Sequence, residues 1–462
     1  MSDSGKELAL GRKLAKAKRT DDAWRICDRW LEDDPNDPNA LSLAAYILHE
    51  TKQFGLAYQA AKRATELAPH KSEPITNLGR TSKELGYLDD AEFCFRKSVQ
   101  LSESPELRGT NLSNLSSVLN DSGKFSAAER VAFEALQLAP HLGEARGNYG
   151  IALLAQGKWE GWEYYRATLG LTRLRLPAGS EPDWDGTKNK SVLFYADQGL
   201  GDEISFASML PKAIEDCKKV VIECDPKLGN LFQRSFPSAS VYGTRKLARS
   251  KWNPDDLNVD YNCSFGDLGA FYCLKNPDGK PYLKSDPQRR LMWRALFDTK
   301  KKPVIGIAWT GGVRHTGAKF REVSLEQLLP IFKSVDAHWV CLQYRDSQEE
   351  IDEFKKLHGD IDLVQYPFAT LTPDYDDTAA LVSECDLVVS MQTAVVHLCG
   401  ALGKECLVLL PKRSQWRYGE EGSKTHWYES VSLYRQKTWG DWKIPIHRIK
   451  DELASRELRK AA

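Results

Sequence analysis

Small and apolar residues recur along the first third of the chain at intervals near 34 residues. Turn segments begin at spacings of 34, 37 and 34 residues, at Lys52, Gly86, Gly123 and Gly157. The same spacings separate the small residues Ala45, Gly79, Ser116 and Gly150, and also the set Ala57, Ala91, Ala128 and Trp162. Three sets of positions in one register indicate an internal repeat. The pattern predicts an all-α array of helical pairs over residues 1–165.

The repeat has a simple physical interpretation. Small residues let the two helices of a pair approach closely, while aromatic and leucine side chains fill the groove between them. Prolines that are expected to end the second helix of each pair stand at Pro35, Pro69, Pro105 and Pro140. The longer spacing indicates an insertion near residues 102–108. Because no pair buries its apolar face alone, stacked pairs share one core and present a concave surface.

This region, roughly residues 20–165, resembles the tetratricopeptide repeat. Leu78-Gly79 and Tyr149-Gly150 match the small-residue signature of that repeat, and the alanines of the third set match its second-helix alanine. The repeat positions themselves are interpreted as core. The resemblance implies a solenoid that binds peptides or partner proteins on its concave face.

The pattern changes after this array. Residues 166–190 are expected to form a polar linker, because they include the Pro- and Gly-containing run 173–190. Beyond it, short apolar runs alternate with helical patterns, which predicts strands at 191–196, 220–223, 240–242, 338–343, 363–366, 387–390 and 406–410, with the order restarting at the run 303–312. The order predicts an α/β region with two parallel sheets, namely a first Rossmann-like lobe (191–300) and a second one (301–445), followed by a C-terminal helix (446–462).

Composition narrows the function classes. Lys plus Arg equals Asp plus Glu at 64 each, so no net field draws the chain to nucleic acid or to an anionic membrane. No apolar run suits a signal peptide or a transmembrane helix, and we therefore expect a cytoplasmic protein. The ten cysteines are scattered without metal-ligand spacing, so neither a structural metal nor a disulfide is expected.

Two segments carry candidate chemistry. The first is the glycine turn Gln198–Asp202, which follows a predicted strand but is neither a dinucleotide fingerprint nor a phosphate-binding loop with its lysine. By default, Asp202 is a first-turn carboxylate that favours the helix dipole. The second is the helix expected to begin near Thr393 after the strand ending at Ser390. Its unpaired backbone N–H groups form an anion site at the carboxyl edge of the sheet.

From about 191 to 445 the chain resembles two-lobed glycosyltransferases of the GT-B fold, specifically the heptosyltransferase-like family 9 and the bacterial fusions of such domains to tetratricopeptide repeats. The resemblance rests on five segments, namely Gln198–Asp202 with Pro211, 306–312, 377–381, 393–403, and Trp427-Tyr428 through Arg435-Gln436. It implies metal-independent transfer of a sugar from a nucleoside diphosphate to an acceptor hydroxyl, with an inverted linkage and no other cofactor.

The resemblance also implies roles for residues. Asp202 occupies the position of the proposed general base. Lys319 and Arg321 are the preferred cations for the departing diphosphate. The donor-binding residues implied are Gln198, Gly199, Gly201, Thr310, Arg314, Lys319, Arg321, Gln343, Gln392, Thr393, His397 and Gly400.

Several positions keep two interpretations. Heptosyltransferases carry Asp-Thr where this chain has Gln392-Thr393, so the donor sugar is expected to differ from a heptose. His397 is either near the donor phosphates or an ordinary packed histidine. Asp377 is interpreted as a helix cap. Five late aromatic residues have two alternative roles, either stacking on a sugar or base or packing between the lobes. They are Trp416, Trp427, Tyr428, Trp439 and Trp442.

The functional alternatives follow from these features. The first lobe, at 110 residues, is short for its family, so the repeats are expected to supply part of the acceptor wall. The acceptor is then a glycan precursor or a protein brought in by the repeats. The rival interpretation is a non-catalytic scaffold whose α/β region has lost activity, which Gln392 favours and the retained Asp202 and His397 oppose.

Overall fold

The computed structural model describes residues 3–172, 181–196, 198–245, 257–273, 278–312 and 321–456. The chain forms two compact units, one ending at Leu153 and the other beginning at Leu154. The division therefore falls earlier than the predicted end of the repeats at residue 165. The reason is helix α10 (Gly161–Thr172), which belongs to the second unit.

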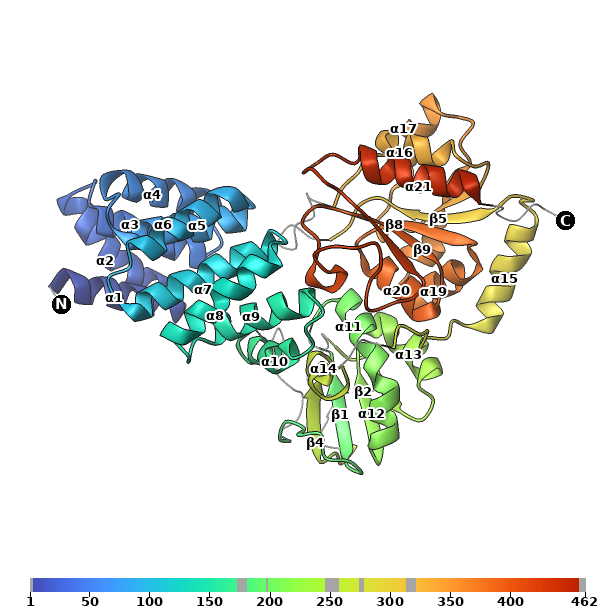
Figure 1. Cartoon of the computed structure of the whole chain (residues 1–462), viewed down its shortest axis with the longest axis horizontal. Helices are drawn as coiled ribbons and strands as arrows, with labels where there is room; N and C mark the ends of the chain where they lie inside the picture. The colour runs from blue at the N-terminus through green and yellow to red at the C-terminus, as the bar shows by residue number, and fades with distance from the viewer. Residues whose placement is uncertain are drawn as a thin grey trace. The chain divides into compact units, whose positions relative to one another are not determined.

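The first unit is a row of helical pairs (Figure 1). Its helices are α1 (Asp3–Lys16), α2 (Thr20–Asp33), α3 (Pro38–Glu50), α4 (Phe54–Leu67), α5 (Ser72–Leu85), α6 (Leu88–Gln100), α7 (Pro105–Asp121), α8 (Phe125–Leu138) and most of α9 (Gly143–Ala155). The predicted small residues lie where helices meet. Ala45, Ala57 and Ala91 have no exposed surface, and a Cβ added at Gly79 would come within 2.9 Å of Phe95 Cε1. Close helix approach thus accounts for the repeat pattern.

One predicted helix end is wrong. Helix α6 stops at Gln100, and Pro105 is the first residue of α7 instead of a residue that ends a helix. Proline suits that position because the first-turn N–H has no partner within the helix. The Ser104 hydroxyl caps the helix by accepting a hydrogen bond from the Leu107 N–H at 3.2 Å. The insertion near residues 102–108 therefore lengthens α7 to 17 residues.

The second unit begins its α/β part with a parallel four-stranded sheet in the order β3-β2-β1-β4. Its elements are β1 (Ser191–Tyr195), α11 (Leu200–Phe206), α12 (Leu210–Asp216), β2 (Lys219–Glu223), α13 (Gly229–Ser235), β3 (Ser240–Tyr242), β4 (Tyr261–Ser264) and α14 (Gly269–Tyr272). The end of the predicted linker joins this sheet, since Asp183 forms a β-bridge with Asn262. Trp184 is buried against Phe194 and Phe271, which holds that segment in place.

A parallel six-stranded sheet follows, in the order β10-β9-β8-β5-β6-β7. Its strands are β5 (Val304–Ala308), β6 (His338–Cys341), β7 (Leu363–Gln365), β8 (Leu387–Met391), β9 (Cys406–Leu410) and β10 (Val431–Arg435). Its helices are α15 (Pro287–Asp298), α16 (Leu325–Phe332), α17 (Gln348–Leu357), α18 (Pro367–Thr370), α19 (Tyr375–Glu384), α20 (Ala394–Leu402) and α21 (Lys443–Ser455). Helices α16, α17 and α21 cover one face, and α19 and α20 lie on the other (Figure 1). The predicted α/β class and parallel strand direction are confirmed.

Helix α21 begins before the predicted C-terminal helix (446–462), and the part of that range after Arg456 lies outside the described residues. Ile446, Ile449 and Leu453 of α21 pack into the core of the six-stranded sheet beside Tyr434. The final helix therefore covers the second sheet. Its apolar positions three and four residues apart form the stripe that makes this packing possible.

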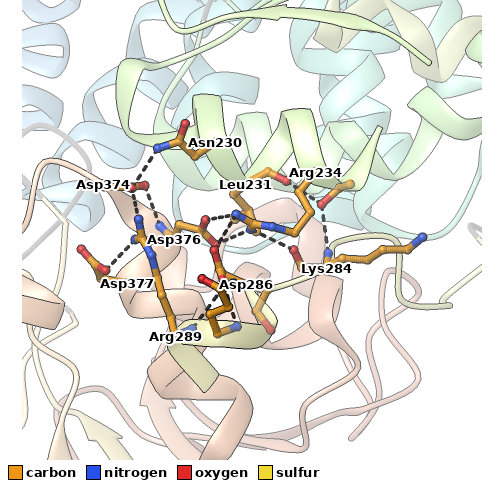
Figure 2. Close-up of polar contacts among 12 residues, drawn as sticks. Asn230, Leu231, Arg234, Lys284, Asp286, Arg289, Asp374, Asp376 and Asp377 are labelled. Atoms are coloured by element: carbon orange, nitrogen blue, oxygen red, sulfur yellow. Dashed lines mark hydrogen bonds and ion pairs between the residues drawn. The ribbon is translucent and has the colours of Figure 1, made fainter. Parts of the chain in front are cut away.

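A cluster of charged side chains joins the helices of the two sheets (Figure 2). Arg234 of α13 forms an ion pair with the fully buried Asp376 of α19 at 2.5 Å. Arg289 of α15 forms ion pairs with Asp374 and Asp377 at 3.0 and 2.5 Å. The interpretation of Asp377 as a helix cap is wrong, because Asp374 caps α19 by accepting from the Asp376 N–H. Asp377 instead helps to join α15 to α19.

Candidate functional site

The first candidate segment lies at the carboxyl end of β1. Asp202 is the third residue of α11, and its Oδ2 accepts a hydrogen bond from the Gly199 N–H at 3.0 Å. Its Oδ1 lies 2.7 Å from Nη2 of Arg417. The Asp202 side chain keeps 30% of its surface exposed, whereas Arg417 keeps 5%. The carboxylate is thus reachable from solvent on one side and ion-paired on the other.

Helix α11 crosses α20 closely, which brings the carboxyl ends of β1 and β8 together. A Cβ added at Gly201 would lie 3.1 Å from His397 Cδ2 and 3.4 Å from the Ala394 Cα. The absence of a side chain at Gly201 therefore permits the crossing. Gly201 was predicted to bind the donor, whereas in the structure it allows α11 and α20 to pack closely.

The second candidate segment follows β8 as predicted. Thr393 caps α20, and its hydroxyl accepts a hydrogen bond from the Val395 N–H at 3.3 Å. The Gln392 side-chain carbonyl accepts from the backbone N–H of Gln415 at 3.2 Å, and its backbone carbonyl accepts from Arg321 at 3.3 Å. Gln392 therefore holds the segment that carries Arg417, a role that a neutral amide performs without a charge.

Three polar side chains connect the carboxyl ends of β5, β6 and β7. The Gln343 amide donates to the Thr310 hydroxyl at 2.5 Å, and the Gln365 amide donates to the Gln343 backbone carbonyl at 3.3 Å. All three are buried. Thr310 and Gln343, which were predicted to bind the donor, are thus brought together, and they hold each other.

Gln198 lies beside α10. Its amide group forms hydrogen bonds with the Tyr165 hydroxyl at 3.2 and 3.3 Å. Its backbone carbonyl accepts a hydrogen bond from Arg245. Arg245 also forms ion pairs with the buried carboxylates of Glu203 and Asp225 at 2.6 and 3.3 Å. A buried charge network therefore fixes the turn that presents Asp202.

His397 is a packed, neutral histidine in this structure. Its Nδ1 lies 3.1 Å from the Tyr428 hydroxyl. Burial, with a contribution from the nearby Arg417 charge, lowers the pKa of His397 to about 3. The imidazole thus contributes no positive charge at neutral pH.

Gly400 has a packing role instead of the predicted donor contact. A Cβ at this position would fall 2.1 Å from Tyr428 Cγ. We expect Gly400→Ala to lower the free energy of unfolding by about 1–3 kcal/mol, because the helix or ring must shift. Thermal unfolding of the full chain measures this.

The matched control is Gly55→Ala in α4, where nothing lies within 4 Å of the added Cβ. Alanine is favoured over glycine in a helix, so this variant is expected to be unchanged or slightly more stable. An unchanged unfolding temperature in Gly400→Ala would contradict the packing role.

Arg417 is the residue that sequence reasoning missed. It lies in a 3-10 turn, Trp416–Tyr418, and its guanidinium carbon stands 4.7 Å from the Phe206 ring centre and 4.4 Å from that of Trp416. Its placement between two aromatic residues after a buried strand was an available signal. Two predicted cations, Arg314 and Lys319, lie outside the described residues. Arg321 is described and buried.

The late aromatic residues divide into two groups. Trp427, Tyr428 and Trp442 are buried, and Trp416 is partly buried. Trp427 packs against Phe206 of the first sheet's helices, whereas Trp442 packs inside the core of the second sheet. Trp439 is 43% exposed and lies 4.1 Å beneath the Arg413 guanidinium. Stacking on a ligand therefore stays a prediction for Trp439.

Two further properties bear on the site. No group of three or more His, Cys, Asp or Glu side chains that suits a metal ion occurs within the described ranges. All ten cysteines are free thiols. In the part of the chain that the structure describes, no helix has both the length and the apolar character needed to cross a bilayer.

Comparison with known proteins identifies the class of the helical array. The family model of the tetratricopeptide repeat matches residues 73–105, which cover α5 and α6. The chain is similar to Protein FlbA of Caulobacter vibrioides, with 27% identity over 439 residues that cover 90% of this chain and 72% of FlbA. That match is too long to be confined to the repeats, so it includes α/β sequence. The name of FlbA states no catalytic activity.

Solved structures also resemble part of the chain. MamA has 18% identity and a TM-score of 0.30, covering 35% of this chain and 93% of MamA. PilF of Pseudomonas aeruginosa has 17% identity and a TM-score of 0.34, covering 46% of this chain and 85% of PilF. Each likeness covers less than half of this chain.

Proposed function

We propose that the second unit is a two-lobed glycosyltransferase of the GT-B kind that uses a nucleoside-diphosphate sugar. The observation that carries the proposal is the partly exposed Asp202 carboxylate at the carboxyl end of β1, which pairs with Arg417, while the adjacent Gly201 packs on Ala394 at the N-terminal end of α20. A proton acceptor and anion-binding groups thus stand at adjacent sheet edges. Ligands of parallel α/β sheets bind at such edges.

The proposed reaction needs few protein groups. The acceptor oxygen attacks the anomeric carbon and forms the new glycosidic bond, while the bond to the diphosphate breaks and its electron pair leaves with the diphosphate. Asp202 accepts the proton of the acceptor hydroxyl. Attack from the face opposite the diphosphate inverts the linkage.

The donor side of the proposal rests on positive charge. Arg321 and Arg417 are guanidiniums held beside the end of β8, and guanidiniums suit the paired oxygens of a phosphate. The N–H groups at the start of α20 add donors of the kind that bind anions. No metal is required for the departing diphosphate in this arrangement.

The repeats suit the choice of acceptor. A tetratricopeptide array is a protein-interaction scaffold, and its concave face presents side chains to a partner. We propose that the repeats select the acceptor, either a glycan or a protein. The donor reacts in the second unit.

The scaffold alternative also has a specific observation in its favour. Gln392 stands where the heptosyltransferases that this sequence resembles carry an aspartate, and its amide is engaged with Gln415. Both Asp202 oxygens have protein partners as well. Under this alternative the repeats carry the whole function and the second unit binds no sugar nucleotide.

The Asp202→Asn variant separates the two functions. Asparagine keeps the acceptor for the Gly199 N–H but cannot take a proton. We expect one nucleotide sugar from a panel to raise the unfolding temperature of the parent chain and of Asp202→Asn. The rate of transfer or of donor hydrolysis should be at least about 100-fold lower in Asp202→Asn than in the parent chain. Thermal-shift and product assays on the full chain measure these. If no nucleotide stabilises either protein, the scaffold function is the correct one.

A further inference from the structure

Charge is unevenly distributed around Asp202. Arg417 and Arg321 are each 5% exposed. Asp202 interacts with both buried guanidiniums, directly with Arg417 and electrostatically with Arg321. Burying a cation is costly unless an anion accompanies it.

The contact between Arg417 and Asp202 is an ion pair without directional bonding. Nη2 of Arg417 lies 2.7 Å from Oδ1 of Asp202, yet neither Nη2 nor Nε of Arg417 makes a hydrogen bond to any described residue. A guanidinium forms strong bonds when two of its N–H groups meet two acceptor oxygens side by side. The Asp202 pair does not provide that arrangement.

The other neighbours of the Arg417 guanidinium are two aromatic rings. It lies over the rings of Phe206 and Trp416, which attract a cation but impose no preferred direction in the plane of the ring. Its backbone is fixed meanwhile, because Gln392 holds the neighbouring Gln415. A shift of the guanidinium along these rings would therefore break no hydrogen bond of Nη2 or Nε, while Gln392 continues to hold the segment that carries Arg417.

A nearby hydroxyl also lacks a partner. Tyr418 is 3% exposed, and its hydroxyl makes no hydrogen bond within the described ranges. It follows Arg417 directly in the chain and acts electrostatically on Arg321. A buried polar group without a partner costs free energy, which a ligand with acceptor oxygens would recover. Arg417, Arg321 and Tyr418 together offer donors to one anion.

We propose that Arg417 is a positioning residue that exchanges Asp202 for the phosphate oxygens of the donor. This inference rests on the proposed function and adds an order of events to it. Without a donor, Arg417 holds the carboxylate. When a diphosphate binds, Arg417 pairs with its oxygens and leaves one oxygen of Asp202 to the acceptor hydroxyl. The base becomes available only after the donor is in place, which disfavours reaction before the complex is complete.

The exchange predicts an unusual direction of effect. Asp202 and a phosphate compete for the same guanidinium, so removing the Asp202 charge must strengthen phosphate binding. The probe is inorganic pyrophosphate, titrated calorimetrically into the full chain. We expect Asp202→Asn to bind it about tenfold more tightly than the parent chain, since the ion pair no longer opposes binding. We expect Arg417→Ala to bind it at least about tenfold more weakly.

Two variants serve as controls. Arg417→Lys keeps the charge but loses the planar fork, so its affinity should lie between those of the parent chain and Arg417→Ala. Arg413 lies in the same segment, and its guanidinium stacks on Trp439. The affinity of Arg413→Ala for pyrophosphate should equal that of the parent chain. Thermal unfolding of each variant without pyrophosphate confirms that it is folded.

The outcomes distinguish this inference from the proposed function. Equal or weaker pyrophosphate binding in Asp202→Asn overturns the exchange, whatever the transfer assay shows. So does the absence of binding to both the parent chain and Asp202→Asn. Tighter binding in Asp202→Asn together with no turnover of any nucleotide sugar supports the exchange and rejects the glycosyltransferase. A merely structural Arg417–Asp202 pair would lower affinity or stability in both variants.

Discussion

Replacing Arg234 with alanine is expected to lower the free energy of unfolding of the second unit by about 3–5 kcal/mol. The reason is Asp376, whose side chain has no exposed surface and pairs with Arg234 through both carboxylate oxygens (Figure 2). Without the guanidinium, a buried carboxylate keeps its desolvation cost and loses its counter-charge. Urea unfolding of the full chain, followed by intrinsic fluorescence, measures the loss.

The matched control is Arg294→Ala. Arg294 also pairs across helices, with Glu384, but its side chain is 47% exposed and Glu384 keeps a second partner in Arg290 at 2.6 Å. We expect a loss below about 1 kcal/mol, as for surface pairs in general. Equal losses in Arg234→Ala and Arg294→Ala would show that burial of Asp376 does not govern the stability of this cluster.

Trp162→Ala is the second substitution with a large expected effect. Trp162 has no exposed surface, and its ring lies on the Gly269 backbone so closely that a Cβ there would be 2.3 Å from Trp162 Cδ2. It also contacts the Phe206, Trp416 and Trp427 rings. Truncation leaves a cavity at the centre of this aromatic group, and we expect a loss of about 3–5 kcal/mol.

The measurement must separate the two units. Amide hydrogen exchange is expected to show faster exchange in β1, β4 and β8 of Trp162→Ala and unchanged exchange in α3 to α6. Phe93→Ala, at a position that is 69% exposed, is the control and should change neither unit. Slower or equal exchange in the second unit of Trp162→Ala would contradict the expected effect.

The same contacts decide where the chain can be shortened. A chain that begins near residue 170 lacks Trp162 and Tyr165, so it is expected to be unfolded or insoluble. A chain that begins at Leu154 keeps both residues and α10. Loss of transfer in the shorter chain therefore says nothing about acceptor binding by the repeats. The longer one provides that comparison.

The amino-acid sequence predicts those parts of the fold that depend on local pattern. The repeat period follows from small residues such as Ala57 and Ala91, and the buried strands from apolar runs such as Leu387–Met391. Strand β4 was missed because it is short and contains the polar residues Asn262 and Ser264. Strand β10 was missed because Ser432 and Arg435 interrupt its apolar pattern.

Contacts between distant segments were not predictable in this way. Arg234 and Asp376 are 142 positions apart, and nothing in either neighbourhood indicates the other. The same is true of Asp202 and Arg417. Asp202 was found because its turn has a recognisable pattern, whereas Arg417 depends on how α11 and the segment after β9 meet. Gly400 was assigned to ligand binding because its contact with Tyr428 is equally invisible in the sequence.

The hydrogen bond between Gln392 and Gln415 has a consequence for ionic strength. Salt screens interactions between charges, but it has little effect on a partly buried hydrogen bond between an uncharged amide and a backbone N–H. Raising the salt concentration therefore weakens the attraction of Arg417 for any anion while the segment that carries Arg417 stays attached to the end of β8. At high salt, the segment that carries Arg417 is therefore expected to keep its position at the end of β8, while the affinity of the site for anions falls.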